Sequence, residues 1–176
     1  MSVANDAELE RLPAARCLLP PGLAVEGYAS LFWAKDLNDD VVAAGAFAES
    51  LAKTGPRGVK MLHGHDAGEP VGVWDEVRED ARGLWVRGRI SGDTARGRMT
   101  AALVRTGALD GLSIGFRTRR ARGDGGRLRV LSEVELWEVS IVTFPMLPGA
   151  RLKLVSSEVG SREWSERADV ALLTTH

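Results

Sequence analysis

The stretch GLSIGF, residues 111–116, places one serine between two glycines inside an otherwise apolar run. Side chains two positions apart in a β-strand point to the same face. Ser113 would then share its face only with Gly111 and Gly115, while the apolar residues point into a core. We interpret the hydroxyl on this bare patch as a candidate nucleophile that a peptide backbone can approach. Glycines inside a strand also mark a bulge or close packing, and the pattern alone leaves that alternative open.

The same letters match Gly-x-Ser-x-Gly, the strand–turn–helix motif that carries the nucleophile of α/β-hydrolases. That motif requires a helix directly after the serine, and the acid and the histidine follow in chain order. Here RTRRARGDGG, residues 117–126, follows and is typical of a charged strand end and a glycine turn. The only histidine after the serine is His176. The context therefore excludes the α/β-hydrolase motif.

Composition predicts one soluble globular domain. The chain has 176 residues, of which 44% are hydrophobic and 27% charged, enough for a single core. A formal net charge of −1 gives no overall attraction to nucleic acid or to an anionic membrane. The single cysteine, Cys17, excludes an internal disulfide, and neither a signal peptide nor a membrane span is evident. We expect a protein of the reducing cytoplasm, without a cofactor.

The chain pattern predicts mostly strands with two helices between them. Apolar alternation and turn signals delimit strands at 23–33, 59–63, 71–77, 84–90, 109–118 and 127–144, with residues 150–155 packing back. Helices fit 46–53 and the segment between an N-cap at Asp93 or Thr94 and Gly107. Residues 1–20 and 156–176 read as polar tails around a domain at 21–155. This order predicts an α+β, mainly β fold: a small barrel or sandwich with helices outside.

Helical spacing also predicts which side of each helix is buried. In the first helix Phe47 and Leu51, four residues apart, share one face. In the second helix the predicted inward face consists of Ala95, Met99, Ala102, Leu103 and Thr106.

A general base for the serine can come from only two histidines of the domain, His63 and His65, in the segment LHGHD, residues 62–66. A neutral imidazole is the usual base for a serine hydroxyl. Two alternatives remain: both histidines are polar residues of a strand edge, or His-x-His-Asp binds a metal ion. Catalytic zinc takes three protein ligands, and no third histidine lies in the domain, although other carboxylates could complete a site.

A carboxylate to orient the imidazole is predicted at Glu138, within VELWEVSIVTF, residues 134–144. By simple alternation Glu138 shares a face with Leu136 and Ser140, and a carboxylate on a largely apolar face needs a partner. We therefore take Glu138 as the third candidate, assisted by Ser140. An ion pair with an arginine is the alternative, and Glu135 is expected on the opposite face, in solvent.

An arginine-rich segment between residues 117 and 129 could bind nucleic acid. Aromatic side chains for base stacking do not interleave it, so a solvated hairpin is the favoured interpretation.

Several separate blocks of the sequence resemble one protein family. They are DDVV (39–42), GAF (45–47), MLHGHD (61–66), PVG (70–72), EDARGL (79–84), GALDGLSIGF (107–116) and LWEVSIVTFP (136–145). Together, over residues 23–152, they resemble the prohead (capsid maturation) serine proteases of tailed bacteriophages, relatives of which occur in gene transfer agents.

The resemblance implies a β-barrel ringed by helices, similar to the herpesvirus assembly proteases. It assigns the nucleophile to Ser113 and the base to His65, the histidine directly before Asp66. His63 falls where the family often has a large apolar residue, which implies a packing role. Herpesvirus relatives use a second histidine as the third member, and this chain offers Glu138 instead.

The implied activity is that of a serine endopeptidase without metal or cofactor. It would cleave the major capsid protein or its scaffold segment, and its own C-terminal tail, inside capsids assembling in the cytoplasm of a bacterial host. Self-association is compatible with this role, whereas membrane or nucleic-acid partners are not expected. The alternatives are an inactive protease fold that serves as an assembly partner, and a metal-dependent hydrolase.

Overall fold

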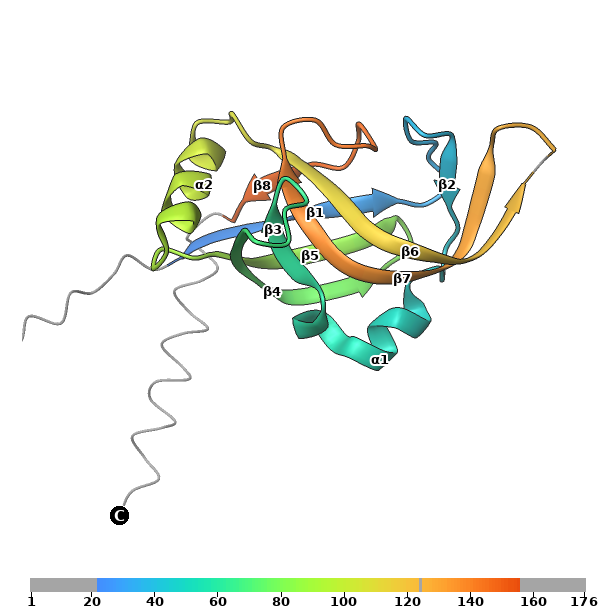
Figure 1. Ribbon diagram of the computed structural model, residues 1–176, viewed down its shortest axis with the longest axis horizontal. Helices are drawn as coiled ribbons and strands as arrows, with labels where there is room; N and C mark the ends of the chain where they lie inside the picture. Colours follow the sequence, from blue (N-terminus) through green and yellow to red (C-terminus); the bar gives the residue numbers. More distant parts are fainter. Residues whose placement is uncertain (1–21, 124, 156–176) are drawn as a thin grey trace, which may run out of the picture.

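Alternating apolar side chains build one curled sheet in the part of the chain that the computed structural model describes, residues 22–123 and 125–155 (Figure 1). Its strands are β1 (Leu23–Leu31), β2 (Asp40–Val42), β3 (Lys60–His63), β4 (Pro70–Glu79), β5 (Gly83–Ile90), β6 (Gly111–Gly123), β7 (Arg129–Val142) and β8 (Leu152–Leu154). The strand order is β2-β7-β3-β4-β5-β1-β8, and β6 pairs with β7. The two helices are α1 (Ala48–Gly58) and α2 (Ala95–Arg105).

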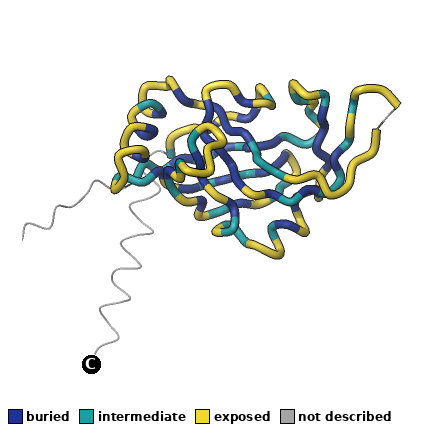
Figure 2. Tube along the Cα trace, viewed as in Figure 1, coloured by how far each residue is buried: buried dark blue, intermediate teal, exposed yellow. Residues whose placement is uncertain are grey.

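The sheet curls until its two ends meet. The first residue of β6, Gly111, forms a β-bridge with Arg151, and the Leu112 N–H donates to the Ala150 carbonyl over 3.0 Å. The inside of the curl holds the core, whose largest fully buried side chains include Trp74 and Phe47. Figure 2 shows that the buried stretches of the chain lie mainly in the sheet. The predicted mainly β fold with helices outside is confirmed.

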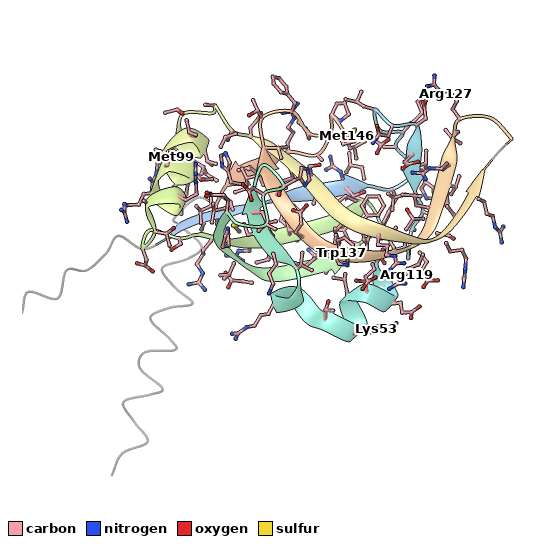
Figure 3. All side chains as sticks on the ribbon, in the orientation of Figure 1. Lys53, Met99, Arg119, Arg127, Trp137 and Met146 are labelled. Atoms are coloured by element: carbon pink, nitrogen blue, oxygen red, sulfur yellow. The ribbon has the colours of Figure 1, made fainter. Side chains whose placement is uncertain are left out.

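A bulge in β7 breaks the alternation that the sequence predicts. Leu136 pairs with Phe116 and Glu138 pairs with Gly115, so Trp137 is an extra residue without a partner on β6. Its side chain is exposed on the outside of the sheet (Figure 3). Leu136 is therefore buried in the core, whereas Glu138 points to the other face of β7. The predicted shared face of Glu138 and Leu136 is wrong for this reason.

The first helix begins after Phe47, which is fully buried, and Leu51 packs against the core beside it, as predicted. The helix runs further than predicted, to Gly58, across a kink at Gly55 and Pro56. Gly55 has a φ of 61°, a conformation that glycine adopts without steric cost.

The second helix begins as predicted, with Thr94 accepting a hydrogen bond from the Gly97 N–H over 3.0 Å. Of its predicted inward face only Leu103 packs against the core, and the other four residues are exposed, so that part of the prediction is wrong. The buried residues are Gly97, Thr100, Ala101 and Val104, and Met99 is 42% exposed (Figure 3). A Cβ at position 97 would lie 2.2 Å from the Ser91 carbonyl oxygen, so the close approach of the helix to the chain after β5 decides which side faces inward.

The far end of the β6–β7 hairpin is exposed (Figure 2). Its arginines form ion pairs: Arg119 with Glu135, Arg120 with Glu133 and Arg129 with Asp40. These pairs fit the solvated hairpin that the sequence favours. Asp40 lies in β2, a short parallel partner of β7 that the sequence pattern did not reveal within its acidic loop.

The predicted tails, 1–20 and 156–176, lie outside the described residues, as does Cys17. Neither helix of the described part has the length and apolar character needed to cross a bilayer.

The Ser50 hydroxyl on α1 should stabilise β7 at its bulge. It accepts the Leu136 N–H over 2.9 Å in a buried position. Ser50→Ala leaves that N–H without its partner, and we expect a loss of about 1–3 kcal/mol in the free energy of unfolding, measured by urea denaturation. Ser132→Ala removes only an exposed contact and is the control, with an expected change below about 0.5 kcal/mol. Equal losses in both variants would contradict the assignment.

Candidate active site

Strands β6 and β7 place three of the candidate residues on one face of the sheet. Ser113 pairs directly with Ser140, and Gly115 pairs with Glu138. Directly opposite residues of antiparallel strands hold their Cβ atoms about 4.5–5.5 Å apart. Ser113, Ser140 and Glu138 are therefore neighbours, which the pairing of the strands decides and the sequence spacing does not.

His65 reaches this face from the loop after β3, the parallel neighbour of β7. Gly64 and His65 have φ values of 62° and 65°, two successive left-handed residues that turn the chain sharply. This conformation is unfavourable for a histidine. It is held by hydrogen bonds: the His65 N–H donates to Ser140 Oγ over 3.0 Å, and the Gly64 N–H donates to the Ile141 carbonyl over 3.1 Å.

The carboxylate of Glu138 binds the imidazole and a hydroxyl at the same time. His65 Nδ1 lies 2.6 Å from Glu138 Oε1, and Ser140 Oγ donates to Oε2 over 2.7 Å. Since the carboxylate can only accept, Nδ1 carries the proton and Nε2 of a neutral ring is left as an acceptor. The structure thus brings together His65, Glu138 and Ser140, as predicted.

The contact with Glu138 changes the pKa of the His65 ring. The hydrogen bond to Glu138 raises the pKa of the His65 imidazole above its ordinary value of 6.5, and the negative charge acts in the same direction. Partial burial opposes the shift. The His65 side chain is 44% exposed while that of Glu138 is only 10% exposed, so the ring reaches toward solvent from a buried anchor.

Ser113 and His65 both line one cleft of about 160 Å³. The serine is 6% exposed. Asn38 and Val42 also line the cleft, as do Met146 and Leu147 from the segment between β7 and β8. The sequence pattern did not identify these residues, because they lie far from the serine along the chain.

The described residues show no hydrogen bond between Ser113 and His65. Their side chains share the cleft, and bonds between catalytic groups often close only when a substrate is bound.

The two glycines beside the serine do not leave a bare patch, and that prediction is wrong. A Cβ at Gly115 would lie 2.0 Å from Glu138 Oε1, and a Cβ at Gly111 would lie 2.7 Å from the Val142 carbonyl oxygen. Both spaces are already filled by β7. The alternative meaning of strand glycines, close packing, accounts for them.

His63 and Glu135 lie apart from this cluster. His63 Nδ1 is 3.2 Å from Thr100 Oγ1, so its ring packs against α2. Because of the bulge at Trp137, Glu135 is on the same face as Glu138 and not on the opposite one, but it pairs with Arg119 in solvent. Within residues 22–123 and 125–155, no three His, Cys, Asp or Glu side chains are grouped as ligands for a metal ion.

Comparison with known proteins identifies the family. The family model of the caudovirus prohead serine proteases matches residues 21–163. The prohead protease of Enterobacteria phage HK97 is 34% identical over 140 residues, 77% of this chain and 61% of that protein. The prohead protease of Escherichia phage T5 is 31% identical over 146 residues, 80% of this chain and 67% of that protein. This chain thus spans about three fifths to two thirds of their lengths.

Solved structures show the same fold at low identity. The bacteriophage T4 capsid assembly protease superposes with a TM-score of 0.56 and 18% identity, over 69% of this chain and 82% of that one. The KSHV protease, solved with a hexapeptide phosphonate inhibitor, gives a TM-score of 0.53 and 16% identity, over 86% of this chain and 75% of that one. By the family match and by its sequence relatives, the chain belongs to the caudovirus prohead serine proteases.

Proposed function

We propose that this protein is a serine endopeptidase that cleaves the major capsid protein, or its scaffold segment, in an assembling phage-like capsid. The observation that carries the proposal is that His65, whose Nδ1 contacts Glu138, lines the same cleft as Ser113. Family membership supports the peptidase class, and the names of the relatives support an action in capsid maturation.

The chemistry proposed is acyl transfer. His65 Nε2 takes the proton of Ser113 as Oγ attacks the peptide carbonyl, and the ring then gives that proton to the leaving amine. Water hydrolyses the acyl-enzyme in a second, equivalent step. Glu138 holds the ring with its proton on Nδ1 and stabilises the imidazolium that forms during each step, while Ser140 fixes the second carboxylate oxygen.

The edge of β6 suits an extended peptide. On the side away from β7, the described part of the chain pairs with β6 only at its start, around Gly111 and Leu112. At Ser113, Ile114 and Phe116 the strand lines the cleft. A substrate could add to it as a further strand, with main-chain hydrogen bonds for affinity and the cleft for one side chain. Residues 156–176 are a candidate segment for self-processing.

Ser113→Ala should abolish cleavage of a co-expressed capsid protein while the fold is retained, because the Ser113 hydroxyl makes no hydrogen bond within the described residues. Loss of a triad serine costs on the order of 10⁶-fold in rate. Intact-mass analysis measures the cleavage, and a peptide phosphonate should label the native protein but not the variant.

Two results would contradict the proposed nucleophile: cleavage by Ser113→Ala at a comparable rate, or loss of activity on chelation of metal ions. The second result would favour a metal-dependent hydrolase. A natively folded protein that never cleaves the capsid protein would favour an inactive assembly partner.

The two histidines should respond differently. His65→Ala removes the proposed base and should abolish turnover of a capsid-derived peptide. His63→Phe removes a contact with Thr100 on α2 and should keep much of the activity, since this ring does not face the cleft. Steady-state kinetics on both variants, with circular dichroism as a folding check, decide the matter. The reverse pattern would move the base to His63.

Glu138→Gln should lower kcat far more than it changes KM. Neutralising the equivalent acid in other serine triads costs about 10⁴-fold in rate. The raised pKa of His65 also sets the pH dependence: the neutral, active ring prevails only above that pKa, so kcat/KM rises with pH through a value above 6.5. Without the carboxylate, this rise should shift to lower pH.

Glu135→Gln is the matched control. It removes a carboxylate from the same strand and face, but one that pairs with Arg119 in solvent. We expect nearly normal kcat and an unchanged pH profile. Near-normal turnover in Glu138→Gln, or a collapse in Glu135→Gln, would assign the third role to another residue.

A further inference from the structure

We propose that Gly115 is a positioning residue: the space left by its missing side chain seats the Glu138 carboxylate that orients His65. The inference rests on the triad of the proposed function for its effect on rate. Its structural part, the seat itself, stands on the packing of β6 against β7.

The seat is defined by three distances. A Cβ built on Gly115 would lie 2.0 Å from Glu138 Oε1, 2.7 Å from Cδ and 2.8 Å from Cγ. Real Cβ contacts are essentially never shorter than 3.0 Å. Turning the carboxylate alone would not relieve the conflict, because Cγ is also too close. The whole side chain would have to swing away, and its short contacts with His65 Nδ1 and Ser140 Oγ would then be lost.

The atoms in conflict belong to a side chain, which sets Gly115 apart from several other glycines of the sheet. A Cβ at Gly72, Gly83 or Gly88 would lie 2.1–2.3 Å from a main-chain carbonyl oxygen, so a substitution there disturbs the strands themselves. At Gly115 the sheet can stay as it is while Glu138 moves. An added methyl group should therefore affect the site more than the fold.

Backbone conformation gives no other reason for a glycine here. The described glycines with a positive φ do not include Gly115, which pairs with Glu138 directly beside the bulge at Trp137. An L-residue can adopt that conformation without strain. A glycine is therefore needed at this position because any side chain would occupy the space of the Glu138 side chain.

Gly115→Ala should lower kcat for a capsid-derived peptide about a hundredfold, with KM nearly unchanged, because a catalytic group displaced by about 1 Å costs on that order. The pKa of His65, followed by NMR titration of its ring, should fall from its raised value toward 6.5 as the contact with Glu138 is lost. Gly123→Ala is the control on the same strand: its Cβ would meet no atom closer than 3.9 Å, and both readouts should stay unchanged.

A double variant tests the seat without relying on activity. With Glu138→Ala the space beside Gly115 is empty, so adding Gly115→Ala should leave the melting temperature unchanged, whereas Gly115→Ala alone should lower it. If the single variant fails to fold, the double variant should fold. Failure of both to fold, or equal losses in both backgrounds, would overturn the proposal.

The two proposals fail separately. A Gly115→Ala protein with full kcat and an unchanged His65 pKa would overturn the seat, whichever residue is the nucleophile. Persistent cleavage by Ser113→Ala would overturn the proposed nucleophile, while the effects of Gly115→Ala on the His65 pKa and on the melting temperature would still support the seat.

Discussion

The buried carboxylate of Glu138 is the constraint on which the arrangement of the site depends. A charged group with so little exposure is costly unless its oxygens are hydrogen-bonded, and both are: one by His65 and one by Ser140. Ser140 in turn accepts the His65 N–H and holds that residue in a left-handed conformation. A network in which each group satisfies another is rigid, because displacement of any member leaves a buried polar group unpaired.

The bulge at Trp137 makes this network possible. Without the extra residue, Glu138 would face the same way as Leu136, into the core. Beside the bulge the Leu136 N–H bonds with Ser50 on α1, so the helix stabilises the strand at its irregular point. The outward face of β7 thereby gains a carboxylate while the inward face remains apolar. Bulges often re-aim a side chain, and the one in β7 turns Glu138 away from the core.

The sharp turn at Gly64 and His65 separates the two neighbouring histidines, His63 and His65. His63 is the last residue of β3 and contacts Thr100 on α2, whereas His65 follows the turn and points back over β7. Two residues of similar chemistry thus acquire different surroundings. One helps to pack the second helix, and the other reaches the cleft with Nε2 available for a proton.

From the amino-acid sequence one can predict the mainly β class, the order of the helices and of the strands other than β2, and the residue types that could form the site. Apolar alternation and turn residues are local signals, and the blocks around His65, Ser113 and Glu138 are specific enough to indicate the family. The faces of Glu138 and of α2, and the role of Gly115, depend on contacts between segments that lie far apart in the chain. Alternation predicts a face only while the pairing is regular, and neither a bulge nor the close approach of two segments leaves a period in the sequence. Gly115 shows this limit most clearly: its neighbours in the chain suggested an open patch, but its partner across the sheet fills that space.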